Sequence, residues 1–177
     1  MHQQTPALVL MTLLTALAGP VSAAQCGNGL LEGGETCVAC AADCAVETCT
    51  PTTPTRAVAL ALTAPPGQAV NGATLLLTYR SRLVSLPGSG ADSSVRSRVT
   101  DTPANAIVAV NDRDYALRIV LARSTGIPAE KIAVVEFDSC QGAAIPTAAD
   151  FACVVEGCAG TFGNVEDCGC TVTMQAR

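Results

Sequence analysis

The sequence is poor in the side chains that most often carry out acid–base chemistry or stack on flat ligands. Its only histidine is His2, it has no tryptophan, and it has only two tyrosines and three phenylalanines. Because no histidine follows position 2, a Ser-His-Asp or Cys-His nucleophilic site is excluded for the rest of the chain. Sugar-binding platforms commonly stack sugar rings on exposed aromatic side chains, so the scarcity of aromatics argues against a platform for crystalline polysaccharide.

A concentration of positive charge and a long apolar run are missing as well. The ten basic residues are dispersed and form no basic cluster, which argues against nucleic acid as a partner. No segment after residue 23 is long and apolar enough to span a bilayer. Residues 7–18 form a short apolar run that ends before small residues at 21–23, which predicts a secretory signal peptide over residues 1–23. We therefore expect a protein that is secreted, held at the cell surface or left in the periplasm.

Cysteine is what the sequence has in abundance. There are ten cysteines, all beyond the predicted signal peptide: Cys26, Cys37, Cys40, Cys44, Cys49, Cys140, Cys153, Cys158, Cys168 and Cys170. Cysteines of an exported protein form disulfide bonds. Cys37-x-x-Cys40 also matches half of a zinc site, but no histidine remains to complete it. Five cysteines lie in residues 26–49 and five in 140–170, so at least one bond joins the two groups if all are paired.

The chain after the signal peptide divides into three parts. Residues 24–49 are a cysteine-rich knot with too few apolar residues to fold without disulfide bonds. Residues 50–55, Thr-Pro-Thr-Thr-Pro-Thr, have the composition of an extended, semi-rigid linker. Residues 56–177 are long enough to bury a core and form the main domain. The knot has four acidic residues and no basic one, whereas the main domain has eleven acidic and ten basic residues.

The main domain shows the period-two alternation of apolar and polar residues that is typical of β-strands. Val58, Leu60 and Leu62 alternate in this way, as do Leu75 and Leu77. Only residues 124–131 have a pattern that allows a helical turn, so we expect an all-β sandwich of about nine strands. The expected strands are 58–62, 75–79, 82–86, 95–99, 106–110, 115–121, 132–137, 151–155 and 170–174.

Two motifs of the main domain resemble a cohesin domain. One is Gly67-Gln68-Ala69-Val70-Asn71-Gly72 followed by Leu75-Leu76-Leu77-Thr78-Tyr79, and the other is Ile132-Ala133-Val134-Val135-Glu136-Phe137. The resemblance covers residues 56–175 and implies a nine-stranded jelly roll, a fold also found in some cellulose-binding modules. It implies a non-catalytic module that binds a dockerin-like protein or another surface component. The cysteines at 140–170 depart from the family pattern.

The knot resembles a short cysteine-rich motif of bacterial secreted proteins. The match lies in Cys26-Gly27-Asn28-Gly29, Gly34-Glu35-Thr36-Cys37 and Asp43-Cys44, with Leu31 where the motif usually has a further cysteine. The sequence predicts no cofactor and no resident metal, but the acidity of the knot makes Glu32, Glu35 and Asp43 candidate calcium ligands. A solvated acidic face is the simpler explanation for the same residues.

Chain order and the expected jelly roll predict three disulfide bonds. Cys140 and Cys153 flank the loop before residue 151, and Cys158 and Cys168 bracket a glycine-rich excursion. Terminal strands are often neighbours in a jelly roll, so the third predicted bond joins Cys49 to Cys170 and thereby connects the two groups.

Three classes of function stay open from the sequence. The first is a secreted, non-catalytic protein-binding sandwich, for which Arg80, Arg82, Arg96 and Arg98 are candidate contacts because arginine is enriched at interfaces. The second is a carbohydrate-binding module with Tyr79 or Tyr115 exposed in a groove. The third is a glycoside hydrolase, with its carboxylate pair drawn from Asp112, Asp114, Glu136 and Asp138. The scarcity of catalytic side chains favours the first class, a protein that is not an enzyme.

Overall fold

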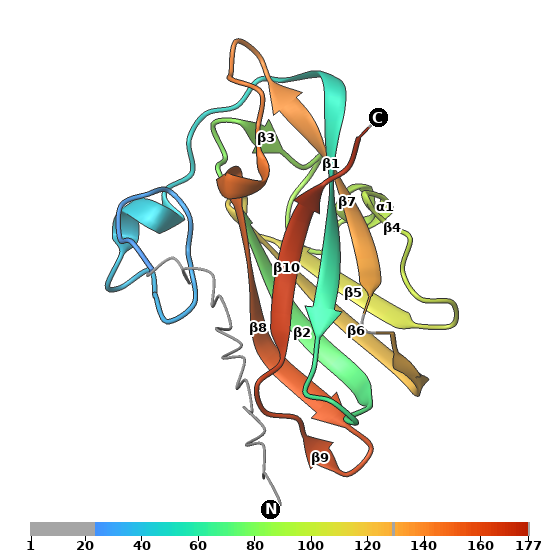
Figure 1. Cartoon of the computed structure of the whole chain (residues 1–177). Helices are drawn as coiled ribbons and strands as arrows, with labels where there is room; N and C mark the ends of the chain where they lie inside the picture. Colours follow the sequence, from blue (N-terminus) through green and yellow to red (C-terminus); the bar gives the residue numbers. More distant parts are fainter. Residues whose placement is uncertain (1–23, 129, 177) are drawn as a thin grey trace, which may run out of the picture.

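Two antiparallel β-sheets pack face to face, and a small disulfide-bonded knot lies beside them (Figure 1). The computed structural model describes residues 24–128 and 130–176. The predicted signal peptide over residues 1–23 lies outside the described residues. Within the described ranges, the helices are too short and too polar to cross a membrane.

The first sheet has the strand order β10-β1-β7-β3, and β4 also pairs with β7. Its strands are β1 (Pro51–Thr63), β3 (Val84–Ser85), β4 (Val99–Thr100), β7 (Lys131–Cys140) and β10 (Gly169–Met174). The second sheet has the order β5-β6-β2-β8-β9. Its strands are β2 (Val70–Tyr79), β5 (Ile107–Asp112), β6 (Ala116–Ile127), β8 (Phe151–Gly160) and β9 (Gly163–Asn164). The prediction of an all-β sandwich is therefore confirmed.

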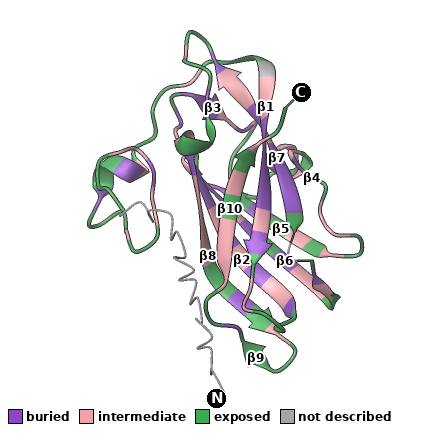
Figure 2. Ribbon diagram, viewed as in Figure 1, coloured by how far each residue is buried: buried purple, intermediate pink, exposed green. Residues whose placement is uncertain are grey.

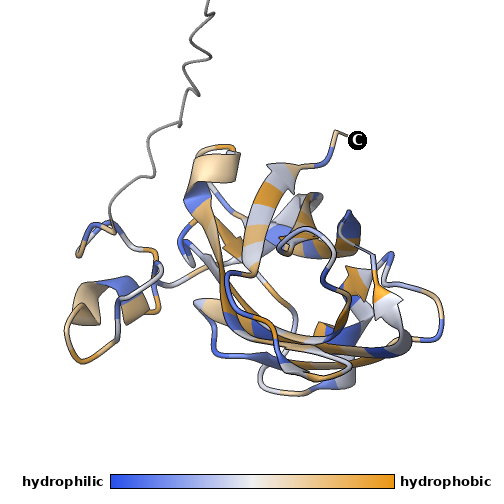
Figure 3. Cartoon of the chain, turned by 60° about the horizontal axis from the view of Figure 1, so that its bottom comes forward, coloured by the Kyte–Doolittle hydropathy of each residue, from blue (hydrophilic) through white to orange (hydrophobic). Residues whose placement is uncertain are grey.

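The core lies between the sheets because the strands alternate their side chains between two faces. Leu60 of β1, Leu77 of β2 and Ile119 of β6 are fully buried there. The interior positions are coloured purple in Figure 2, and the alternation of apolar and polar residues is visible along the strands in Figure 3. Phe137 joins the two sheets by aromatic contacts, with ring centroids 4.9 Å from Tyr79 and 5.4 Å from Phe151. Most aromatic side chains are thus used in the core.

Three segments differ from the sequence prediction. Residues 95–99, predicted as a strand, form the helix α1 (Ser93–Ser97) and only then enter β4. Val95 and Val99 are both buried, and a spacing of four residues satisfies a helix as well as a strand. Residues 124–131, whose pattern allowed a helical turn, form none in their described part, because β6 continues to Ile127 and β7 begins at Lys131. The predicted linker at 50–55 is extended, but β1 begins at Pro51, which is the register partner of Cys140 in β7.

All ten cysteines are paired, in five disulfide bonds. The predicted bond Cys158–Cys168 is confirmed, and Cys49–Cys140 joins the two cysteine groups as the count requires. The predicted bonds Cys140–Cys153 and Cys49–Cys170 are wrong. Cys140 ends β7, whose antiparallel neighbour β1 begins just after Cys49, whereas Cys153 lies in the other sheet. Cys153 instead bonds Cys170 and thereby connects β8 of one sheet to β10 of the other.

Candidate functional site

The knot is held together by two disulfide bonds and one buried carboxylate. Cys26 bonds Cys40, and Cys37 bonds Cys44. The carboxylate is that of Asp43, which is only 2% exposed. It accepts hydrogen bonds from the backbone N–H groups of Gly27 and Gly29, the shortest at 2.7 Å. These bonds fix the shape of a segment that has almost no apolar core.

Polar contacts fix the knot against the sandwich. The Thr78 hydroxyl on β2 donates to the Leu31 carbonyl at 3.1 Å, and the Cys37 Sγ lies 3.3 Å from the Tyr115 hydroxyl. The Glu47 backbone N–H donates to the Ser81 hydroxyl at 2.8 Å. Together with the Cys49–Cys140 bond, these contacts place the knot over one end of the outer face of the second sheet, beside β8 and β2 in Figure 1.

A groove of about 350 Å³ lies between the knot and this sheet. Its floor includes Leu76 of β2, Val154 of β8 and the half-buried ring of Tyr115. Its wall is the knot segment around Glu35 and Cys37. Leu76 and Val154 are direct register partners, so two apolar side chains stand side by side on a face that most sandwiches leave polar. We define the binding groove by these residues and by Arg118 and Glu156.

An ion pair forms one border of the binding groove. Arg118 Nε lies 2.7 Å from Glu156 Oε2, and a second guanidinium nitrogen donates to Oε1 at 2.8 Å, so the pair is bidentate. The hydrogen bond and the charge of Glu156 raise the pKa of Arg118 above its usual value. Glu156 is the extra residue of a β-bulge, because the β2–β8 register shifts between Thr74 and Leu75. The bulge turns its carboxylate toward Arg118.

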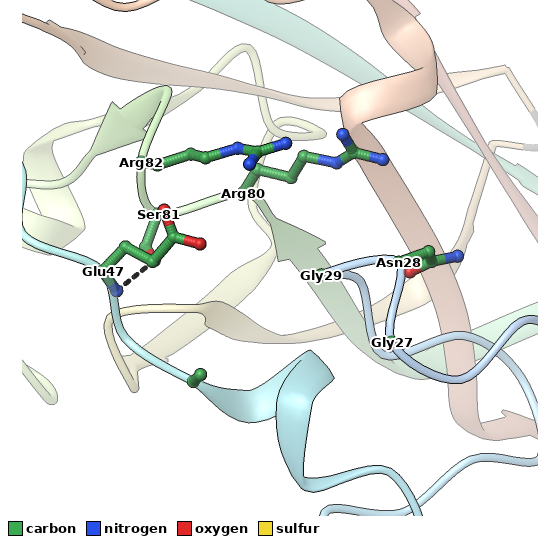
Figure 4. A pocket seen from close by; sticks show the side chains of 8 residues that line it. Gly27, Asn28, Gly29, Glu47, Arg80, Ser81 and Arg82 are labelled. Atoms are coloured by element: carbon green, nitrogen blue, oxygen red, sulfur yellow. Dashed lines mark hydrogen bonds between the residues drawn. The ribbon is translucent and has the colours of Figure 1, made fainter.

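The four candidate arginines do not form one site. Arg80 and Arg82 line a small cavity of about 130 Å³ between the knot and the chain after β2, as Figure 4 shows. There Arg80 pairs with Asp150 at 3.5 Å, whereas Arg82 is exposed. Arg96 and Arg98 belong to the α1 region, where Arg96 donates to the Val99 carbonyl and Arg98 pairs with Asp138 at 2.7 Å.

The structure also separates the four candidate carboxylates. Asp112 and Asp114 lie at the turn between β5 and β6, whereas Glu136 and Asp138 lie on β7 in the other sheet. Asp112 is buried and accepts a 2.6 Å hydrogen bond from the Tyr79 hydroxyl. Burial, aided by the charge of Asp114, raises the pKa of Asp112 although the Tyr79 bond opposes the shift. Burial and the Asp112 charge raise the pKa of Tyr79 as well, so its hydroxyl remains the donor.

The candidate calcium ligands are already engaged within the knot. Glu32 accepts from the Gln25 backbone N–H at 2.9 Å and from the Asn28 side chain at 3.1 Å, and Glu35 accepts from the Glu32 backbone N–H. Among the residues that the structure describes, the one group of potential metal ligands that converges is Cys26, Cys40 and Asp43. Cys26 and Cys40 are bonded to each other and offer no thiolate.

Comparisons with known proteins add no identity to this geometry. The chain matches no protein-family model, no curated protein and no solved structure. The cohesin resemblance therefore stays a prediction.

Most of the binding groove is not predictable from the sequence. The unbroken Leu75-Leu76-Leu77 run is a signal that both faces of β2 are covered. Nothing in the sequence indicates that the knot provides the cover. A second opening, about 380 Å³ near Leu62 and Ile127, has one charged residue, Arg123, which already bonds the carbonyls of Ala104 and Gly126. The binding groove therefore offers the better combination of apolar and polar groups.

Proposed function

We propose that this protein is an exported, non-catalytic binding module that holds a segment of an extracellular protein in its binding groove. The observation that carries the proposal is the pairing of an apolar sheet face, Leu76 beside Val154, with a wall that two disulfide bonds make rigid. A surface that is already ordered loses little conformational entropy when a partner binds. The five disulfide bonds fit an oxidising compartment outside the cytoplasm.

The chemistry of the groove favours a partner with aliphatic side chains next to a basic residue. Leu76 and Val154 supply apolar contacts, and Glu32 and Glu35 in the lining belong to a knot without a basic residue. Arg118 already neutralises Glu156, and Arg113, the other arginine of the lining, offsets only one of the two knot carboxylates, so the lining keeps an excess of one negative charge. Charge complementarity of this kind guides association and falls with added salt.

Carbohydrate binding is the second candidate, and one observation favours it. Tyr115 is half-buried and lines the groove beside planar polar side chains, an arrangement that can stack on a sugar ring. No observation of this kind favours a hydrolase, since Asp112 is inside the sandwich and Asp138 is paired with Arg98.

The test compares variants of the full chain on the same sheet face. Val154→Glu and Leu76→Glu place a charge in the groove, whereas Val120→Glu places one on the neighbouring outer surface of β6, where Val120 is 39% exposed. Immobilised protein is offered the native secretome, and a glycan array is probed in parallel. We expect a retained protein that both groove variants lose and the Val120 variant keeps. Glycan binding with the same dependence on the variants would instead support the second candidate.

Two results would contradict the proposed function. One is partner binding that both groove variants leave intact. The other is hydrolysis of a glycoside or polysaccharide panel that disappears in Glu136→Gln or Asp138→Asn.

A further inference from the structure

Accessibility sets the Cys37–Cys44 bond apart from the other four disulfide bonds. Cys37 is exposed and Cys44 is half-buried, so neither end of this bond is closed off from solvent. Three of the other bonds each contain one buried cysteine: Cys40, Cys140 and Cys158. Both cysteines of the fourth, Cys153–Cys170, pack against the core of the sandwich. Thiol–disulfide exchange requires access to a sulfur atom, so a reductant reaches Cys37–Cys44 most easily.

The surroundings of Cys37 also favour its release as a thiolate. The Tyr115 hydroxyl lies 3.3 Å from Cys37 Sγ, and it is the donor of that contact because a bonded sulfur carries no proton. A hydrogen-bond donor stabilises the negative charge that develops on a sulfur when its disulfide bond breaks. A stabilised thiolate leaves faster, so Tyr115 makes Cys37 the better leaving group of the pair.

The second bond of the knot, Cys26–Cys40, has the opposite surroundings. Cys26 is exposed and open to attack, but the sulfur that would then leave is that of Cys40. Cys40 is only 8% exposed, and its Sγ lies 3.8 Å from Glu35 Oε1 and within 4.8 Å of a carboxylate oxygen of Asp43. Burial and two neighbouring carboxylates both disfavour a thiolate at Cys40. The knot therefore combines one bond that opens readily with one that resists reduction.

The bond that opens readily belongs to the wall of the binding groove. Cys37 lines the groove, and its disulfide bond ties this wall to the short helix η1 (Ala41–Cys44). The backbone hydrogen bonds of the turn at 36–40 are local, from Ala39 and Cys40 to the Thr36 carbonyl. Val38, at the tip of this turn, is 97% exposed and adds no packing. The position of the turn therefore depends on the disulfide bond.

We propose that Cys37–Cys44 is a redox switch of the binding groove, which a dithiol in the surroundings of the exported protein reduces to release the bound segment. A thiolate of the dithiol attacks Cys44 Sγ, the bond between Cys44 and Cys37 breaks, and Cys37 leaves as a thiolate beside Tyr115. The second thiolate of the dithiol then attacks the reductant's own sulfur in the mixed disulfide, and Cys44 leaves in turn. The dithiol becomes a disulfide, the protein gains two electrons, and the two protons of the dithiol pass through solvent to Cys37 and Cys44.

Reduction at this bond loosens the wall without detaching the knot. Cys26–Cys40 stays closed, and the contact between Thr78 and Leu31 still joins the knot to β2. A wall that has to be ordered when the partner binds adds an entropic cost to association, which weakens binding. The release of a partner rests on the proposed function, whereas the selective opening of the bond does not.

Graded reduction of the full chain tests the selectivity. Native protein is treated with dithiothreitol, free thiols are trapped with N-ethylmaleimide, and peptide mapping reads each cysteine. We expect Cys37 and Cys44 to be labelled at least tenfold faster than any other pair. Tyr115→Phe should slow their reduction severalfold and leave the rate at Cys158–Cys168, the internal reference, unchanged. Another bond that opens first, or a Cys37–Cys44 rate that Tyr115→Phe does not lower, would overturn the proposal.

Two double variants test the effect on the groove. Cys37→Ser with Cys44→Ser imitates the reduced state, and Cys158→Ser with Cys168→Ser is the matched control, since the two bonds span 7 and 10 residues of sequence. Circular dichroism checks that both variants fold. We expect amide exchange in residues 31–37 to be at least tenfold faster in the first variant and in selectively reduced wild type, and unchanged in the control. Unchanged exchange in all three proteins would overturn the switch.

Binding separates this inference from the proposed function. A secretome protein that wild type retains should bind at least tenfold more weakly to Cys37→Ser with Cys44→Ser and equally well to the control. Equal binding by both double variants would overturn the switch and leave the proposed function standing. If wild type retains no partner, the proposed function fails, and the labelling and exchange results still decide whether the bond controls the wall.

Discussion

At the scale of single residues, the buried pair of Tyr79 and Asp112 makes the stability of the sandwich depend on pH. A carboxylate inside a β-sandwich is costly unless it is hydrogen-bonded, and here a 2.6 Å bond from Tyr79 stabilises it. Because burial raises the pKa of Asp112 in the folded state, its protonated form favours folding. That contribution is full below the unfolded pKa, near 3.8, and is lost as the pH rises through the folded pKa.

Tyr79→Phe should therefore destabilise the protein more at neutral pH than at pH 3. The variant removes the bond that lowers the pKa of Asp112, so the pKa rises further and the charged form costs more. We expect a loss of about 2 kcal/mol at pH 7 in urea unfolding and a smaller loss at pH 3. Thr74→Val, which removes a half-buried hydroxyl from the same strand, is the control and should change little at either pH. Equal losses at both pH values would show that Asp112 plays no part.

At the scale of elements, the disulfide bonds differ in the length of chain that each closes into a loop. Cys49–Cys140 spans 91 residues of sequence and fixes the start of β1 against the end of β7, whereas Cys37–Cys44 spans only 7 within the knot. A longer closed loop restricts the unfolded chain more. Replacing Cys49 and Cys140 by serine should cost about 4.5 kcal/mol of unfolding free energy in the chain-entropy model, against about 2.5 kcal/mol for Cys37 and Cys44. Guanidinium unfolding of the two double variants measures the difference, and equal costs would contradict this ranking.

Strands were predictable where the alternation was long, and uncertain where it was short. Val58, Leu60 and Leu62 repeat the two-residue interval twice and are buried as expected. Val95 and Val99 offer only one interval, which fits a helix and a strand equally, and tertiary packing selected the helix. Disulfide pairing depends on which strands become neighbours, so only Cys158–Cys168, close in sequence around a turn, was found. The binding groove escaped prediction because the contact of Thr78 with Leu31 joins segments 47 residues apart.

At the scale of the whole molecule, the contact between Thr78 and Leu31 holds the knot and the sandwich together as one unit. The Thr78 hydroxyl is 1% exposed and donates to the Leu31 carbonyl at 3.1 Å, with the Ala152 carbonyl more distant at 3.4 Å. Thr78→Val keeps the shape of the side chain but removes its only donor, and so leaves the Leu31 carbonyl without its partner from β2. Thr74→Val, on the same face of the same strand but outside the groove lining, is the matched control.

Loosening the knot should expose Tyr115 to solvent and leave Tyr79 buried. Tyr115 lies under the knot segment at Cys37, whereas Tyr79 is in the core at 1% exposure and serves as the internal reference. In hydroxyl-radical footprinting read by mass spectrometry, we expect Thr78→Val to increase oxidation of Tyr115 severalfold and to leave Tyr79 protected. Partner binding should weaken at least tenfold in the same variant, because the wall of the groove is then no longer held in place. If Tyr115 reacts equally in the wild type, in Thr78→Val and in Thr74→Val, the knot is held by its disulfide bond and its other contacts, and the Thr78 hydroxyl does not set the geometry of the groove.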